Sequence, residues 1–80
     1  MLTRVKICGI TRIEDALTAI RLGANAIGFI FWDKSARYID PKEARKIVMA
    51  LPPFVTVVGV YVNPSSEWVE ETCSIAGLNL

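Results

Sequence analysis

Three short apolar segments dominate this chain, and a helix-like pattern follows each of them. The segments cover residues 4–8, 26–31 and 55–62. A strand that is apolar on both faces, as the second is, belongs in a parallel sheet covered on both sides. Connections long enough to hold a helix join parallel strands by right-handed crossovers. The sequence therefore predicts three consecutive strand–helix units.

The first predicted helix has a start and a stop signal. Thr11 and Glu14 fit a capping box, in which each side chain bonds the backbone N–H of the other residue. An apolar stripe at helical spacing follows and consists of Ile13, Ala16, Leu17 and Ile20. Gly23 then ends the helix in the left-handed conformation.

The other two helices are bounded by similar signals. Asp40 is the predicted N-cap of the second helix, Pro41 takes its first position, and the proline pair at 52–53 ends it. The turn at 63–66 offers several N-caps for a third helix, which ends at Gly77.

Strand order decides between two architectures. If the strands lie side by side in chain order, all helices fall on one face and the other face stays apolar and bare. A closed (βα)8 barrel rolls that face inward, whereas a doubly wound sheet reverses the strand order and covers both faces. The 80 residues suffice for one small domain, and their 52% hydrophobic content is high for that size. Residues 78–80 resemble the start of a further element.

Composition excludes several classes of function. The net charge is +1 with no block of like charges, so nothing favours nucleic acid or an anionic membrane. There is no apolar run of the roughly 18 residues that a membrane span needs, and no signal peptide is evident. The two cysteines do not have metal-site spacing and fit free thiols in a reducing cytoplasm. The absence of histidine removes His-dependent mechanisms, and no glycine-rich phosphate loop is present.

Cys8 is the first candidate for chemistry. It ends the first strand and lies on the same strand face as Lys6, two residues earlier. A nearby ammonium favours the thiolate, and without histidine the thiolate fits a proton-transfer base better than an acylating nucleophile. The alternative is that Cys8 is a small buried hydrophobe. Lys6 either points inward to the site or extends its ammonium to a strand end.

The polar loop at 32–39 is long for a strand-to-helix connection, which is typical of functional loops. It carries Arg37, whose guanidinium suits a carboxylate or phosphate, unless it is a solvated loop cation. Trp32 and Tyr38 either line a pocket for an aromatic ligand or cover the rim of the fold. Two further side chains of the loop, Asp33 and Lys34, are interpreted as plain surface charges.

Cys73, in the third helix, is interpreted as a core residue. Only Cys8, Lys6 and Arg37 are expected to converge at one end of the sheet. A base and an anion-binding group make half of a catalytic site.

These motifs resemble phosphoribosylanthranilate isomerase, an enzyme family of tryptophan biosynthesis. The matching segments are Val5-Lys6-Ile7-Cys8-Gly9-Ile10-Thr11, Gly28-Phe29-Ile30-Phe31 with Lys34-Ser35-Ala36-Arg37-Tyr38-Ile39, Pro52-Pro53-Phe54-Val55, and Val58-Gly59-Val60-Tyr61-Val62-Asn63. The resemblance covers essentially the whole chain.

The resemblance implies an α/β fold of the (βα)8 barrel class, of which residues 1–80 are the N-terminal (βα)3 part. It implies an Amadori rearrangement of N-(5'-phosphoribosyl)anthranilate without metal or cofactor, in the cytoplasm. Cys8 matches the family's general base, and Arg37 matches the arginine that binds the anthranilate part. We expect Lys6 to assist in substrate binding. Oligomeric state does not follow from the sequence.

The family's general acid and phosphate site belong to later strands, so we expect the 80 residues alone to be inactive. The alternative is a complete, flavodoxin-like module without catalysis. It would bind a partner through its apolar sheet face, and Cys8 would then be a core residue.

Overall fold

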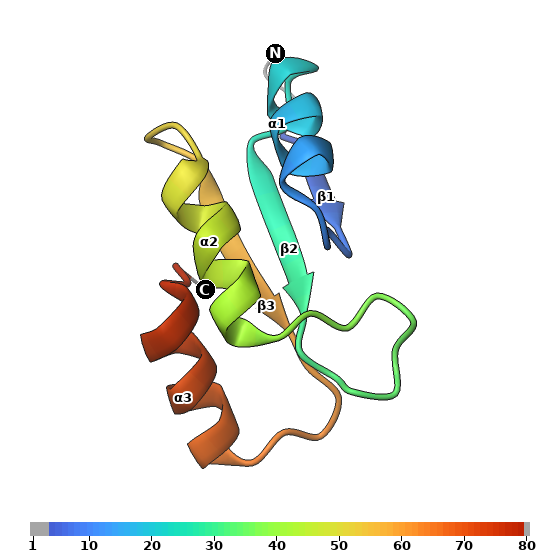
Figure 1. Cartoon of the computed structure of the whole chain (residues 1–80), viewed down its shortest axis with the longest axis vertical. Helices are drawn as coiled ribbons and strands as arrows, with labels where there is room; N and C mark the ends of the chain where they lie inside the picture. Colours follow the sequence, from blue (N-terminus) through green and yellow to red (C-terminus); the bar gives the residue numbers. More distant parts are fainter. Residues whose placement is uncertain (1–3, 80) are drawn as a thin grey trace.

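The computed structural model describes residues 4–79, in which strands and helices alternate strictly (Figure 1). The strands are β1 (Lys6–Cys8), β2 (Ala26–Ile30) and β3 (Thr56–Val60). The helices are α1 (Ile13–Arg21), α2 (Pro41–Ala50) and α3 (Ser66–Ala76). The three predicted strand–helix units are confirmed.

The strands form one parallel sheet in the order β1-β2-β3, so neighbours in the sequence are neighbours in space. The register aligns Ile7 with Ile27 and Ile27 with Val57. Within the described part of the chain, this order lacks the reversal that defines a doubly wound sheet. The arrangement is the one predicted for strands of a barrel.

The core lies between the sheet and the helices. Ile27 and Phe29 of β2 are fully buried, and they belong to one apolar cluster with residues from every helix. The helix members of that cluster with no more than a few per cent exposure are Ala16, Ala44, Ile47 and Ala76. Figure 1 shows α1 over β1 and α2 over β3, with α3 beside α2. All three helices therefore pack on one face, as predicted.

The opposite face of the sheet is bare. Because side chains alternate along a strand, this face carries the residues out of phase with the core. They are Lys6, Cys8, Ala26, Gly28, Ile30, Thr56, Val58 and Val60. Among them only Gly28 is buried, and the others are partly or largely exposed. We call these residues the bare face.

The predicted capping box of α1 is wrong. The N-cap is Arg12, in extended conformation, and no side chain caps the helix. The Glu14 carboxylate instead accepts a hydrogen bond from the Arg12 guanidinium, with 2.5 Å between nitrogen and oxygen. Because the helix begins at Ile13, Glu14 is its second residue and not its third, so its side chain forms this ion pair and not the bond of a capping box. The pair also lowers the pKa of Glu14.

The other helix boundaries agree with prediction. The Asp40 carboxylate accepts from the backbone N–H of Lys42 at 2.8 Å, and Pro41 begins α2. Gly77 ends α3 with φ of 78°, a left-handed conformation that costs glycine little.

The strands are shorter than predicted. For β1 and β3 the loss is two or three residues, and for β2 it is one. The ladder nevertheless continues past β2, because the Phe31 N–H donates to the Val60 carbonyl at 2.9 Å. Of the element expected at 78–80, residue 80 lies outside the described residues. The Asn79 N–H already donates to the Val57 carbonyl at 2.9 Å.

The bare face predicts how the 80-residue chain behaves alone. We expect it to self-associate and to bind a hydrophobic dye, because apolar residues of this face meet water. Sedimentation and dye fluorescence measure this. Val60→Lys should reduce association by placing a charge on the bare face, whereas Val57→Lys, on the buried side, should abolish folding. A sharp, cooperative unfolding transition of a monomer would contradict the expectation.

Candidate functional site

The carboxyl ends of the three strands meet at one edge of the sheet, as parallel strands require. β1 ends at Cys8, and the segments after β2 and β3 extend beyond the same edge (Figure 1). In barrels this edge carries the active site. The candidate functional site therefore lies here.

Cys8 lies on the bare face as a partly buried free thiol. Its register partner on β2 is Gly28. The Gly28 carbonyl accepts two hydrogen bonds, from the N–H of Gly9 at 3.0 Å and from the N–H of Ile10 at 3.2 Å. These two hydrogen bonds hold the chain immediately after Cys8 against β2. A glycine with φ of 82° makes the turn there.

Arg37 comes from the loop between β2 and α2, whose turn is held by a hydrogen bond from the Arg37 N–H to the Ser35 hydroxyl at 3.1 Å. Its side chain lies directly against Gly9: a Cβ atom on Gly9 would stand 2.6 Å from the Arg37 Cδ and 3.2 Å from Nη1. The structure therefore brings Arg37 next to the residue that follows Cys8. The expected convergence of these two residues is found.

Lys6 is farther from this edge. It is exposed and lies on the same face as Cys8, two residues earlier, which is about 6.6 Å along a strand. It borders a shallow hollow of about 300 Å³ that also involves residues at the amino ends of the strands. The other lining residues are Arg4, Val5, Asn25, Ala26, Thr56 and Val58. The expected convergence of Lys6 with Arg37 is not found, because Lys6 begins β1 and lines a hollow near the opposite edge of the sheet.

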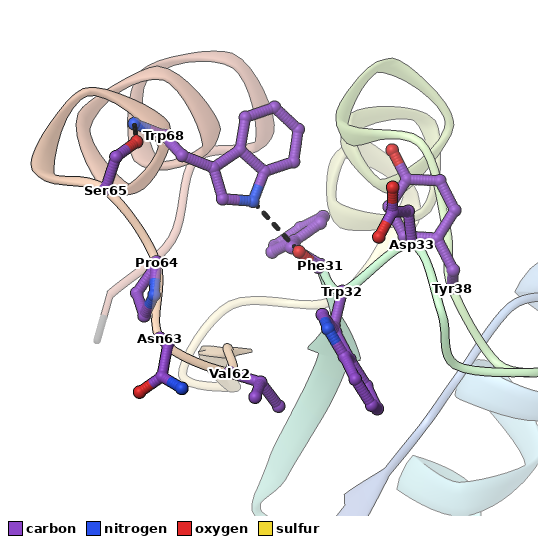
Figure 2. A pocket seen from close by; sticks show the side chains of 9 residues that line it. All are labelled: Phe31, Trp32, Asp33, Tyr38, Val62, Asn63, Pro64, Ser65 and Trp68. Carbon is purple, nitrogen blue, oxygen red and sulfur yellow. Dashed lines mark hydrogen bonds between the residues drawn. The ribbon is translucent and has the colours of Figure 1, made fainter.

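A second hollow lies at the carboxyl ends of β2 and β3 and has a volume of about 390 Å³. Its walls are Phe31, Trp32, Asp33, Tyr38, Val62, Asn63, Pro64, Ser65 and Trp68. Figure 2 shows the Trp68 and Tyr38 rings on opposite sides, with Phe31 between them. The Trp68 indole N–H donates to the Phe31 carbonyl at 2.9 Å and fixes that wall.

Sequence reasoning found only part of this hollow. Trp32 and Tyr38, which the sequence assigned either to a ligand pocket or to the rim of the fold, both line this hollow, but the contribution of residues 62–65 and of Trp68 was not predicted. Period-two alternation from Val58 and Val60 does indicate that Val62 continues the bare face. Cys8, Lys6 and Arg37 are not among the residues that line the hollow.

Two tyrosines near this edge have perturbed acidity. Burial raises the pKa of Tyr38, and the nearby charges of Asp40 and Asp33 raise it further. Burial also raises the pKa of Tyr61, whose hydroxyl lies 2.5 Å from the Thr72 hydroxyl. For Tyr61 the hydrogen bond with Thr72 opposes this rise in pKa, but burial has the larger effect.

Other expectations concern features away from the edge. Cys73 is partly buried in α3, less than a core residue would be. Among residues 4–79, His, Cys, Asp and Glu side chains do not gather in a group of three that suits a metal ion. None of the helices described is long and apolar enough to cross a membrane.

The geometry thus defines a strand-end site on a three-unit piece of an α/β barrel. The model of the family N-(5'-phosphoribosyl)anthranilate (PRA) isomerase matches residues 5–80. This chain belongs to that family.

The relatives and the solved structures match nearly all of this chain, and this chain matches a similar share of each of them. The chain is 69% identical over 80 residues to the N-(5'-phosphoribosyl)anthranilate isomerase of Nitrosospira multiformis, and 65% identical to that of Nitrosomonas europaea. Each match spans all of this chain but only 38% of the relative. The crystal structure of phosphoribosyl anthranilate isomerase from Thermotoga maritima superposes with a TM-score of 0.95 at 52% identity, covering 98% of this chain and 38% of that one.

A second solved structure of the enzyme contains reduced 1-(o-carboxyphenylamino)-1-deoxyribulose 5-phosphate. It has a TM-score of 0.95 and 52% identity, and the match covers 98% of this chain and 40% of that one. The predicted fold class, part of a (βα)8 barrel, is therefore confirmed.

Stability should depend on pH through Tyr61. Its folded-state pKa is raised, so the unfolded chain loses the phenolic proton first as the pH passes about 10. The unfolded state then binds fewer protons than the folded state, and the free energy of unfolding falls with rising pH. Denaturant titrations at several alkaline pH values measure the slope.

The protein for this measurement is a chimera in which residues 1–80 replace the aligned 80 residues of the Nitrosospira multiformis relative. Tyr61→Phe should lower stability near neutral pH by about 1 kcal/mol, through the lost hydrogen bond to Thr72, and should flatten the alkaline slope. Tyr38→Phe is the matched control, because it removes the other phenol with a raised pKa and leaves the hydrogen bond between Tyr61 and Thr72 in place. An unchanged slope in Tyr61→Phe would refute the assignment.

Proposed function

We propose that residues 1–80 form the N-terminal (βα)3 part of a single (βα)8 barrel that isomerises N-(5'-phosphoribosyl)anthranilate. The product would be 1-(2-carboxyphenylamino)-1-deoxyribulose 5-phosphate. Membership of the family supports this, and so does the related structure whose bound compound is a reduced form of that product. The observation that carries the proposal is the convergence of Cys8 and Arg37 at the active edge.

In the proposed reaction Cys8 is the base. After the ribose ring opens, C1' is joined to the anthranilate nitrogen as an iminium. The Cys8 thiolate removes the proton from C2', the C–H electron pair becomes the C1'=C2' bond, and the C=N pair moves onto nitrogen. The enol then loses its O–H proton while C1' gains one, which leaves the ketone and conserves all atoms.

Arg37 serves as the anion-binding group in this proposal. Its guanidinium forms paired hydrogen bonds with a carboxylate, and the anthranilate ring bears one. The side chain of Arg37 lies against Gly9, so the guanidinium is held beside the residue that follows the proposed base. We further propose that Lys6 contributes to substrate binding from the bare face, where its side chain is exposed.

The remainder of the reaction belongs to residues beyond this chain. By the family resemblance, the general acid and the phosphate site follow later strands. Loss of one proton-transfer group typically costs about 10²–10⁴-fold in rate. The free thiols Cys8 and Cys73 are consistent with a reducing, cytoplasmic location for the enzyme and its small-molecule substrate.

The first test compares the 80-residue chain with the chimera. We expect the chimera to consume substrate, followed by the anthranilate fluorescence, and the short chain to be silent because half of the site is missing. The unaltered Nitrosospira multiformis protein is the positive control. Activity of the short chain would refute the half-site argument, and a folded but silent chimera would refute the proposed function.

Substitutions in the chimera test the proposed roles of Cys8 as base and of Arg37 as the anion-binding group. Cys8→Ala should lower kcat by about 10²–10⁴-fold without unfolding the protein, because the base is gone. Arg37→Ala should mainly raise KM, by roughly 10- to 100-fold, the loss of a charge-assisted pair worth about 1.5–3 kcal/mol. Cys73→Ala and Lys34→Ala are the matched cysteine and loop-cation controls.

The same variants separate catalysis from the alternative function. In a partner-binding module, Cys8→Ala would change stability only, and turnover would be absent throughout. Steady-state kinetics beside thermal unfolding distinguishes the two.

A further inference from the structure

We propose that Gly28 and Gly9 are positioning residues of the site, whose missing side chains determine where the Cys8 thiol and the Arg37 guanidinium lie. This inference rests on the proposed function. A Cβ atom at either glycine would crowd one of these side chains: Gly9 lies in the turn after β1, and Gly28 lies in the neighbouring strand β2, opposite Cys8.

Gly28 provides the space occupied by the thiol. A Cβ atom there would stand 3.2 Å from the Cys8 sulfur, 3.3 Å from the Cys8 Cα and 3.5 Å from the Cys8 Cβ. The first two separations are tighter than nine in ten of those that real Cβ atoms show. The crowding against the Cys8 backbone cannot be relieved by rotating a side chain. Any residue larger than glycine would therefore push the thiol away from its present position.

The backbone at Gly28 has no room to move away from Cys8, because β2 is paired with a strand on each side. It is buried in the central strand, where it is aligned with Cys8 on one side and Val58 on the other. Its carbonyl also accepts the two hydrogen bonds from Gly9 and Ile10. A new side chain at position 28 would thus shift Cys8 by a few tenths of an ångström instead of moving β2.

Gly9 leaves the space that the Arg37 side chain occupies. Its φ of 82° disfavours residues other than glycine, asparagine least among them, and a Cβ atom would come within 2.6 Å of the Arg37 Cδ. The two requirements are physically independent, because one concerns backbone conformation and the other concerns the space above the backbone. Arg37 must leave its position if either an alanine or an asparagine replaces Gly9.

Two other glycines serve as controls, because one tests only the strain of a positive φ and the other tests only the crowding by an added Cβ atom. Gly23 has φ of 105°, and a Cβ atom added there would meet nothing within 4 Å, so its substitution tests backbone strain alone. Gly59 has an ordinary φ, but a Cβ atom added there would lie 2.7 Å from the Leu78 Cδ1 and 2.8 Å from the Tyr61 ring, on the core side. Its substitution tests crowding away from the site.

The first experiment measures Gly28→Ala in the chimera. A displacement of the base by a few tenths of an ångström should lower kcat by about 3- to 10-fold while KM stays within about twofold, because Arg37 is untouched. Gly59→Ala should lower the unfolding temperature but leave kcat per folded molecule unchanged. Unchanged kcat in Gly28→Ala would overturn the role of Gly28.

The second experiment uses a double-mutant cycle at Gly9. Gly9→Ala should raise KM by roughly 10-fold in the chimera, but by no more than about twofold when Arg37 is already alanine, because the clash partner is gone. Gly9→Asn tolerates the positive φ and should still raise KM. Gly23→Ala and Gly23→Asn should leave KM unchanged. Equal effects of Gly9→Ala in both backgrounds would overturn the role of Gly9.

Outcomes that refute the proposed function differ from outcomes that refute the roles of the two glycines. In the first case the chimera itself is silent, or Cys8→Ala is as active as the parent. If Gly28→Ala does not fold, the Gly9 cycle still decides whether a glycine seats a functional side chain at this edge.

Discussion

Parallel pairing of β2 with both neighbours, in chain order, is the constraint on which the rest of this structure depends. Every connection crosses the same side of the sheet, so all helices cover one face. Ile27 and Phe29 are buried there, and Cys8 is left on the other side. The proposed site and the core thus occupy opposite faces of the same three strands.

The order of the elements was predictable because it depends on local signals. Asp40 with its following proline, and Gly77 after α3, act through their own backbone conformation and nearest neighbours. The box at Thr11 and Glu14 failed because the helix begins one residue later than predicted, with Arg12 as its N-cap. Sequence patterns locate the end of a helix only to within one or two residues.

That Cys8 and Arg37 lie at one edge of the sheet was predictable, but their geometry and most of the residues that line the hollow were not. The position of Cys8 at a strand end follows from pattern alone. That Arg37 folds back over Gly9 depends on the path of the connection between β2 and α2, which no periodicity encodes. The same holds for Trp68, which reaches the hollow from a helix that begins well after β2 ends. Tertiary contacts of this kind become visible only in three dimensions.

The alternation of side chains along β2 assigns its positions to two different constraints. Ile27 and Phe29 face the helices, whereas Gly28 and Ile30 face the side of Cys8. Under the proposed function, a substitution in the first pair would act mainly on the packing of the core, and a substitution in the second pair would act mainly on the surroundings of Cys8. Both constraints apply within a single five-residue strand.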